Sequence, residues 1–492
     1  MRSKYGIIPA LVLALAAAGC TDLDITDPNQ RTAETFWRTE SDATQGVNAT
    51  YRALEENGTY GRWMQFATDI RSDLGRSRSP WGDLSNFTKS VLSSYDFEVN
   101  RELWQHHYQA IFRANQVIAY VPAIDMDAAQ RDRIVGEAKY IRALMYFDLV
   151  NLYGRVPMVL TPSVPTDRPT QATAAETWAQ VEKDLTEAAA VLPASYGGGD
   201  EGRATRGAAT GLLGKAYLQQ QKWAQAASAF ATVRASGQYQ LMPAFGDNFI
   251  AANDNNRESV FEVQFGGPEV LAAGARGQNL LKMMGPCDVG FCDGEPTQWL
   301  FQQMQAERTT AGAADPRLDA TLFYNKPGGM DVYTKPFAER YGNRLGDVFW
   351  KKMGEYYKDN QDWDNPINVK VMRLGGIMLL EAEALVEQNR AADAKPLVDA
   401  VRARAGLAAL PTGLSQAQMR DRVEHEQIME LAFEFERWLW LARHGYLTDG
   451  AKIAVLKSHD SDFDLFDAHR ALLPIPSTET NLNPNVEQNP GW

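Results

Sequence analysis

Carboxylates that a hydrolase could use occur as two pairs along the chain. A glycosidase needs two carboxyl groups roughly 5 to 9.5 Å apart. Glu137 and Asp148 lie on one predicted buried helix, but eleven residues apart, which separates them by about 16 Å along the axis. Glu430 and Glu434 are one helical turn apart, and Arg437 follows three residues after Glu434, a spacing that favours an ion pair. The sequence therefore predicts structural rather than catalytic carboxylates at both places.

Metal-binding patterns are incomplete. The stretch DSDFDLFD (460–467) alternates aspartates as a calcium loop does. Leu465, however, occupies the position where such a loop needs glycine, and no glutamate closes the loop. The six histidines are scattered. We therefore predict a solvated acidic turn, no metal site and no cofactor, and leave open whether a structural calcium is bound.

The chain has three cysteines. Cys287 and Cys292 are separated by four residues in PCDVGFC. An oxidising compartment permits a disulfide between them, whereas a metal site would need two further ligands. We expect the disulfide.

Cys20 ends an apolar stretch at the start of the chain. Residues 7–18 are apolar but too few to span a membrane, which takes roughly 20 residues, so they indicate a secretory signal. Ala-Ala-Gly before Cys20 looks like a bacterial lipobox. We expect residues 1–19 to be a signal peptide that is removed, and Cys20 to carry acyl chains such as palmitate, which hold a protein on a membrane. Residues 20–32 would form a flexible tether. Ordinary secretion with an incidental cysteine is the alternative.

Aromatic residues in irregular segments are candidates for ligand contacts. Sugar C–H faces and apolar peptide side chains can both lie on an aromatic ring. Trp81, in RSRSPWGDLSNF with Asn86 nearby, and Trp299, in GEPTQWL, meet this condition. Five further tryptophans lie on apolar helix stripes and are excluded: Trp37, Trp104, Trp178, Trp223 and Trp438. The alternative for Trp81 and Trp299 is that each plugs the core beneath its loop.

The elements that must position these residues are mostly helices. Ser41 is a possible N-cap of the first helix, and Gly154 ends a helix that is apolar nearly all round and is therefore expected to be buried. Later helices form pairs that resemble tetratricopeptide hairpins. The stretch 242–368 is rich in Gly, Asn, Asp and Pro and predicts loops with a few short strands, such as SVFEVQF. Helices are predicted over 40–56, 103–121, 136–154, 172–192, 205–220, 222–241, 371–388 and 391–407.

Composition excludes some functions. The chain has 492 residues, 45% of them hydrophobic, and a net charge of −13. A large core is therefore possible, and nucleic acid is an improbable ligand because its binders need a basic surface.

Several segments together resemble the SusD/RagB family. They are FWRTESDATQGVNATYRAL, GEAKYIRALMYFDLVNLYGRVPMVL, RLGGIMLLEAEALVE, LVDAVRARAGL, ELAFEFERWLWLARHG and LLPIPSTETNLNPNVEQNPGW, and they cover essentially the whole mature chain. Phe435, Trp440 and His444 depart from the family pattern, which commonly has Gly, Asp and Trp at these positions. We expect these changes to affect only local packing in the last long helix.

The resemblance implies a fold and a function. The fold is a mainly α, right-handed scaffold of tetratricopeptide-like hairpins with an irregular, loop-rich part that carries short strands. It divides into an N-terminal SusD-like half (33–241) and a C-terminal RagB/SusD half (242–492) with a loop-rich insert (242–368), packed as one globular unit. The protein would be an outer-membrane, lipid-anchored lipoprotein that faces the cell exterior and has no catalytic activity.

The implied ligand is a nutrient oligomer, most often a glycan. The protein would deliver it to a SusC-like TonB-dependent transporter. The alternatives are a peptide-binding lid of the same kind of transporter and a secreted glycoside hydrolase. The family places ligand contacts in roughly the loops of Trp81 and Trp299, without a motif that fixes individual residues.

Overall fold

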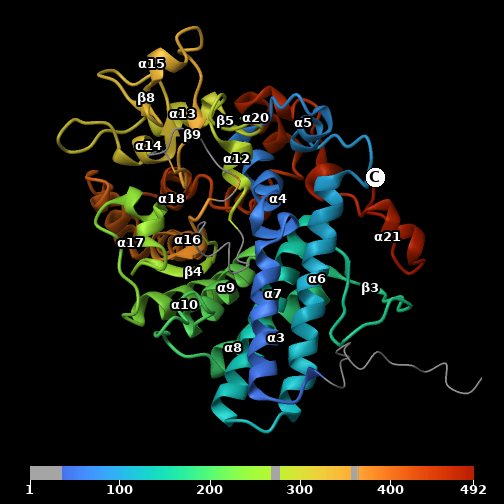
Figure 1. Ribbon diagram of the computed structural model, residues 1–492. Helices are drawn as coiled ribbons and strands as arrows, with labels where there is room; N and C mark the ends of the chain where they lie inside the picture. The colour runs from blue at the N-terminus through green and yellow to red at the C-terminus, as the bar shows by residue number, and fades with distance from the viewer. Residues whose placement is uncertain (1–35, 267–276, 356–362, 364) are drawn as a thin grey trace, which may run out of the picture.

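Long helices dominate the N-terminal half. The computed structural model describes residues 36–266, 277–355, 363 and 365–492 (Figure 1). Four helices of this half pack in sequence against one another, and three of them stand side by side in Figure 1. They are α3 (Glu40–Arg52), α6 (Glu98–Tyr120), α7 (Ala128–Tyr153) and α8 (Ala174–Val191). The predicted mainly helical fold is confirmed.

Helix α7 is the buried centre of this half. Between positions 136 and 153 only Lys139 and Asn151 are not fully buried. The side chain of Asp127 caps the N-terminus by accepting from the Gln130 amide, and Gly154 ends the helix with a φ of 71°, a conformation that glycine adopts without steric cost. The prediction of a buried helix ending at Gly154 is confirmed.

The start of α3 differs from the sequence prediction. The N-cap is Thr39, not Ser41. The Thr39 hydroxyl accepts from the Asp42 amide at 3.2 Å, and the Asp42 carboxylate accepts from the Thr39 amide at 2.9 Å. This reciprocal pair satisfies two free amides at once, which Ser41 could not do from inside the helix.

Two helix hairpins pack on each other in the middle of the molecule. Helix α10 lies against both α9 and α16, and α16 also contacts α17. A Cβ atom at Gly214 would lie 2.6 Å from the ring of Phe230, so the close approach of α9 and α10 requires glycine there. The predicted tetratricopeptide-like hairpins are confirmed; they are α9 (Arg206–Gln219), α10 (Trp223–Ala235), α16 (Leu374–Glu387) and α17 (Ala391–Arg404).

The stretch between the hairpins holds short strands and short helices, as predicted. SVFEVQF contributes β4 (Ser259–Val263), which pairs antiparallel with β10 (Val369–Arg373). The other strand pairs are β1 (Gly75–Arg76) with β5 (Glu295–Pro296), β2 (Val156–Pro157) with β3 (Gln171–Ala172), β6 (Leu322–Phe323) with β9 (Phe349–Trp350), and β7 (Asp331–Val332) with β8 (Lys335–Pro336). The short helices are α12 (Leu280–Met284), α13 (Gln298–Met304), α14 (Pro316–Thr321) and α15 (Phe337–Arg340).

The last long helix of the sequence prediction is two helices. Helix α18 (Gln416–Leu431) ends before α19 (Arg437–Arg443) begins. Between them Phe433 and Phe435 have φ values of 68° and 65°, which an α-helix cannot contain. Phe435 thus takes a glycine-like conformation, and its ring packs edge-on against Tyr60 at 5.4 Å. The remaining helices are α4 (Trp63–Gln65), α5 (Gly82–Thr88), α20 (Gly450–His459) and α21 (Ser477–Leu482).

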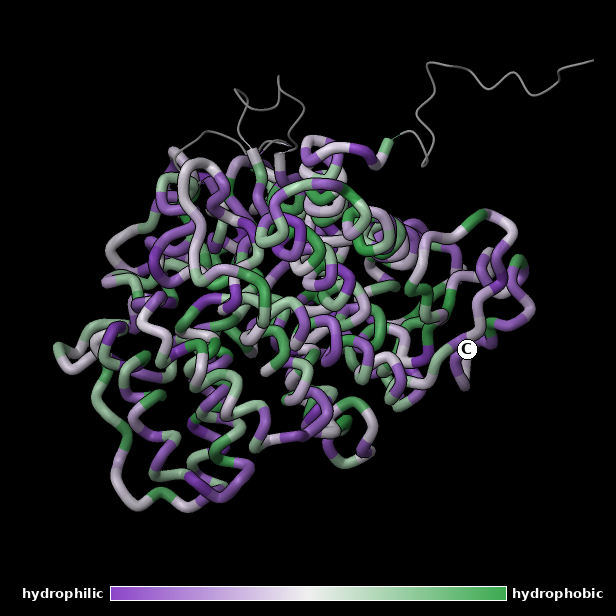
Figure 2. The backbone as a smooth tube through the Cα atoms, turned by 90° about the horizontal axis from the view of Figure 1, so that it is seen from below, coloured by the Kyte–Doolittle hydropathy of each residue, from purple (hydrophilic) through white to green (hydrophobic). Residues whose placement is uncertain are grey.

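One large hydrophobic core joins the two halves. Its buried residues run from α4 through α7 and the hairpins to the C-terminal segments. Hydrophilic and hydrophobic residues are interspersed along the helices (Figure 2), and α7 is buried on nearly all sides. In the part of the chain that the structure describes, no helix is long and apolar enough to cross a membrane.

Candidate functional site

Two loops distant in sequence are tied together near the edge of the helical scaffold. Strand β1 pairs with β5, so Gly75 lies opposite Pro296. The Thr297 hydroxyl donates to the Asp73 carbonyl at 2.8 Å, and Arg78 pairs with Glu295 at 2.9 Å. The loop that carries Trp81 and the loop that follows the Cys287–Cys292 segment therefore form one surface.

Three exposed aromatic rings belong to this surface. Trp81 is 37% exposed, Phe291 49% and Trp363 42%. Phe291 and Trp363 contact edge to face, with ring centroids 5.4 Å apart. The Arg62 guanidinium lies 5.3 Å from the Trp363 ring. We call Arg62, Trp81, Phe291 and Trp363 the aromatic surface.

Arg62 links the exposed rings to the core. Its guanidinium lies 4.8 Å from the ring of buried Trp63, which in turn contacts the Trp81 ring at 6.3 Å. Its Nε atom donates to the Asn279 side chain at 3.0 Å, and Asn279 donates to Asn57 at 3.1 Å. Burial lowers the pKa of Arg62, and nearby carboxylates oppose that shift. The Arg62 side chain therefore lies between the rings of Trp63 and Trp363. A planar guanidinium suits this position because it can stack on aromatic faces.

Phe291 is held outward by backbone contacts. Its amide donates to the Lys282 carbonyl at 2.8 Å, and the next two amides donate to Gly285 and Met283. The Sγ atoms of Cys287 and Cys292 lie 2.10 Å apart, with Cα atoms 4.9 Å apart. These contacts hold the cysteine loop against α12, where the Phe291 side chain is exposed.

Polar groups flank the rings. The Asp293 carboxylate accepts a hydrogen bond from Ser79, which belongs to the Trp81 loop. Burial raises the pKa of Asp293, while Ser79 and Arg62 oppose that rise. Asn86 is exposed on α5. Rings with adjacent carboxylate, amide and guanidinium groups can hold a hydroxyl-rich ligand by stacking and hydrogen bonding.

Trp299 stands in a different environment from Trp81. It is half-buried and packs against the main core. Its ring stacks on His459 at 4.1 Å with an interplanar angle of 13°, so one face is covered. The ring contacts that the structure gives for Trp81 are with Trp63 and Phe97, and those for Trp299 are with His459 and Arg437.

Sequence reasoning found Trp81 and missed Phe291 and Trp363. The signals for both were present. Phe291 sits inside a six-residue loop closed by cysteines, which is too small to enclose a ring. Trp363 is the single aromatic residue in the polar run NQDWDNP, where no apolar partner is available locally.

The carboxylate pairs are structural. Glu137 binds Arg133 at 2.8 Å and Arg203 at 3.0 Å. Asp148 accepts from the Tyr60 hydroxyl at 2.8 Å. Neither group is free to transfer a proton to a substrate.

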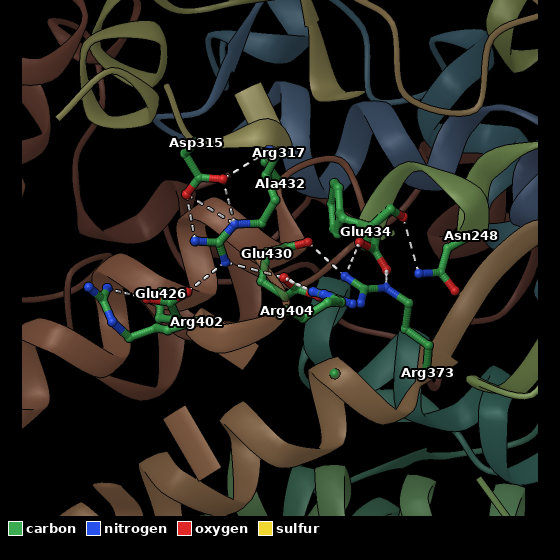
Figure 3. Close-up of polar contacts among 12 residues, drawn as sticks. Asn248, Asp315, Arg317, Arg373, Arg402, Arg404, Glu426, Glu430, Ala432 and Glu434 are labelled. Atoms are coloured by element: carbon green, nitrogen blue, oxygen red, sulfur yellow. Dashed lines mark hydrogen bonds and ion pairs between the residues drawn. The ribbon is translucent and has the colours of Figure 1, made fainter. Parts of the chain in front are cut away.

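Glu430 and Glu434 belong to a buried charged cluster (Figure 3). The expected ion pair between Glu434 and Arg437 is wrong: Glu434 binds Arg373 and Lys352, and Arg437 binds Asp73 and Glu424. The break between α18 and α19 removes the helical spacing on which the expectation depended.

We define the charged cluster by its paired side chains, each of which is at most 8% exposed. Burial opposes ionisation of Glu430, but Arg404, Arg373 and Arg317 outweigh it and hold the pKa of Glu430 well below its usual range. A carboxylate fixed in its ionised form cannot act as a general acid. The cluster consists of Glu258, Asp315, Arg317, Lys352, Arg373, Arg402, Arg404, Glu426, Glu430 and Glu434.

The side chains that could bind a metal make other bonds in the structure. Among the described residues, Cys287, Cys292 and Glu295 form the one group whose ligand atoms gather within 4.8 Å, and its two cysteines are bonded to each other. Asp460 and Asp467 accept from backbone amides at the start of short 3₁₀ turns. Cys20 lies outside the described residues.

The described residues thus combine a scaffold of helical hairpins with an exposed aromatic surface. Two family models match nearly the whole chain: one described as the SusD family over residues 236–492, and one described as starch-binding associating with outer membrane over residues 23–218. The chain belongs to the SusD family.

Relatives and solved structures agree with this assignment. The SusD-like protein P25 of Formosa agariphila is 28% identical, with 97% of each chain covered. A SusD superfamily protein from Bacteroides vulgatus is 23% identical, with 93% of this chain and 100% of that chain covered and a TM-score of 0.83. A laminarin binding SusD-like protein is 26% identical, with 93% and 100% covered and a TM-score of 0.73.

Proposed function

We propose that this protein is a cell-surface lipoprotein that binds oligosaccharides on the aromatic surface. The observation that carries the proposal is the set of three exposed rings, Trp81, Phe291 and Trp363, organised around Arg62. The name of the laminarin binding relative and the starch-binding description of the matching family model support a glycan ligand.

The proposed mechanism is stacking followed by hydrogen bonding. Covering about 100 Å² of apolar surface contributes roughly 2.5 kcal/mol, so two or three rings give useful weak binding after the cost of association. Arg62 contacts the Trp363 ring, Trp63 and Phe97 contact the Trp81 ring, and the cysteine loop holds Phe291. Rings that are already held by the protein lose less entropy on binding. Asp293, which interacts with Arg62, offers an acceptor near the rings, and Asn86 is an exposed amide on the neighbouring helix α5. No bond of the ligand is broken in this role.

Affinity electrophoresis tests the proposal. The purified protein runs through native gels that contain laminarin, starch, xylan or mannan. Phe291→Ala and Trp363→Ala should each weaken binding about tenfold or more. Phe112→Ala is the matched control, because Phe112 is 38% exposed on α6 and outside the surface. Equal retardation of all three variants would contradict the aromatic surface, and binding of peptides but not glycans would favour the peptide-binding alternative.

We further propose that acyl chains on Cys20 hold the protein on the outer face of the outer membrane. The lipobox-like sequence and the family description as associating with outer membrane support this. Cys20→Ser should move the protein from the membrane fraction into soluble material. A variant that still fractionates with membranes and is still digested by protease on whole cells would exclude the acyl tether.

The partner we propose is a SusC-like TonB-dependent transporter that receives the bound oligosaccharide. Membership of the SusD family supports this partnership. Extraction in mild detergent should recover the chain together with a much larger β-barrel protein. Recovery of a lone monomer under several gentle conditions would count against the partnership.

A further inference from the structure

A second aromatic hollow lies between the start of α10, helix α18 and the α19–α20 turn. Its volume is about 710 Å³, within the range of small-molecule sites. It shares no lining residue with the aromatic surface. We propose that this hollow is a second saccharide-binding site, specific for a neutral sugar unit.

The rings of the hollow form an ordered stack. Trp223 and His444 are stacked with centroids 6.2 Å apart, and His444 and Trp440 with centroids 4.4 Å apart. Tyr446 leans on Trp440 at 5.2 Å. The His444 Nε2 atom lies 2.9 Å from the Glu383 carboxylate. Trp223 and Tyr446 are both half-buried and both line the hollow. Trp223 also packs against the main core, and the Lys452 ammonium lies 5.3 Å from the Tyr446 ring.

The sequence expectation of local packing holds for Trp440 and His444, which stack on each other one helical turn apart. In the structure Trp440 is buried and both residues line the hollow. The third residue of that group, Phe435, also packs locally, against Tyr60.

Two ion pairs neutralise part of the charge around the rings. Arg420 makes a two-point pair with Glu387 at 2.6 and 3.0 Å. Glu424 pairs with Arg437 at 3.0 Å, and Lys452 donates to the His444 carbonyl at 2.6 Å. An anionic ligand would meet Glu387, Glu424 and Asp421, and a cationic one would meet Arg420 and Lys452. This balance of positive and negative side chains in the lining favours an uncharged ligand.

Free polar groups remain for such a ligand. Within the part of the chain that the structure describes, no hydrogen bond is found for the exposed Asp421 carboxylate or for the Tyr446 hydroxyl. Sugar hydroxyls both donate and accept, so they can use a carboxylate and a phenol side by side. Apart from the rings, Ala442 is the one apolar residue in the lining, so polar groups surround the rings.

The test uses four proteins in native gels with laminarin, starch, xylan or mannan. A Phe291→Ala/Trp363→Ala double variant disables the aromatic surface. Into it we introduce Tyr446→Ala, Asp421→Ala or, as the matched control, Asp464→Ala, an exposed aspartate outside the hollow. The double variant should remain retarded in at least one gel. Tyr446→Ala and Asp421→Ala should each lower that residual affinity about tenfold, and Asp464→Ala should not.

The outcomes separate the two sites. Loss of all retardation in the double variant would overturn the second site and leave the aromatic surface standing. Residual binding that Tyr446→Ala and Asp421→Ala leave unchanged would also overturn the second site. Residual binding that depends on both Tyr446 and Asp421 supports the second site. If the double variant also binds as tightly as the wild type, the second site stands and only the proposal for the aromatic surface is overturned. If none of the four polysaccharide gels retards the wild-type protein, both proposed saccharide-binding sites are overturned.

Discussion

The aromatic surface and the charged cluster use opposite chemistry for opposite purposes. The cluster collects five cations and five carboxylates from separate segments and shields them from water. The aromatic surface leaves apolar rings in water and keeps a guanidinium between one of them, Trp363, and the buried ring of Trp63. Residue types that often catalyse are thus held in ion pairs within the scaffold, while residue types that often fill cores are exposed to solvent.

The arrangement of the cluster explains why its carboxylates are structural. Arg373, at the end of β10, pairs with Glu258, Glu430 and Glu434. Arg317, on α14, is fully buried and pairs with Asp315 and with residues of α18. The cluster therefore clamps the loop-rich stretch onto the last hairpin and α18. Burying such a group without its partner is far more costly than leaving it paired.

Glu430→Gln is expected to have the largest effect. The substitution keeps the shape but leaves Arg373 and Arg404 facing a neutral amide in a buried site. Loss of one partner of a buried pair costs about 3–5 kcal/mol. Urea unfolding should show a midpoint that is clearly lowered, with glycan affinity of the folded fraction unchanged. The control is Glu201→Gln on an exposed turn. An unchanged midpoint for Glu430→Gln would mean that the cluster contributes little to stability.

The next largest expected effect is a fall in the free energy of unfolding at acidic pH, caused by protonation of Asp73. Asp73 is buried, which opposes ionisation, but its two-point pair with Arg437 and the contact with His459 lower the pKa of Asp73 to about 2. The ordinary value is 3.8. A depressed folded-state pKa stabilises the protein above the unfolded value, and this stabilisation is lost as pH falls from about 4 toward 2. The difference corresponds to about 2.5 kcal/mol.

Unfolding free energies measured between pH 5 and pH 2 check this. Asp73→Asn should flatten the decline by about this amount, because the amide does not titrate. Asp464→Asn, on an exposed turn, should leave the slope as in the wild type. A wild-type slope in Asp73→Asn would show that other carboxylates carry the acid sensitivity.

The sequence was sufficient for the features that depend on local patterns. The segment 136–154 is apolar nearly all round, and Gly154 ends it, so the burial of α7 and its C-terminus could be predicted. Trp81 stands in a Pro-Trp-Gly turn that gives a ring no local partner. The resemblance to the SusD family supplied the hairpin architecture.

Features that depend on tertiary contacts could not be predicted. The pairing of Arg373 with Glu258 and Glu430 joins segments more than fifty residues apart, and no periodicity records it. The break at 432–436 places two phenylalanines at positive φ, which their residue type disfavours. The neighbourhood of Phe291 and Trp363 likewise exists only once α12 and the loop before β10 have folded.

The cysteine loop links stability and binding. We predict that Cys287 and Cys292 remain bonded in the purified protein, so mass spectrometry without reductant should find a linked peptide pair. Closing so short a loop stabilises by about 2 kcal/mol in the chain-entropy view. The double variant Cys287→Ser/Cys292→Ser should weaken glycan binding as well, because Phe291 lies between the two cysteines. Two free, alkylatable thiols in the native protein would refute the bridge.

The smallest expected effect separates Trp81 from Trp299. The Trp81 ring is exposed beside the aromatic surface, so Trp81→Ala should weaken glycan binding about tenfold, or about 1.4 kcal/mol, and leave the melting temperature nearly unchanged. One face of Trp299 is covered by His459, which itself contacts Asp73 at 3.0 Å. Trp299→Ala should therefore lower the melting temperature by a few degrees and leave the affinity of the folded fraction intact. Binding isotherms and thermal melts of the two variants, measured on the same preparations, decide the matter. If Trp299→Ala instead weakens binding without a change in melting temperature, the second ring is a ligand platform as the sequence alone indicated, and the aromatic surface extends from Trp81 across β5 to α13.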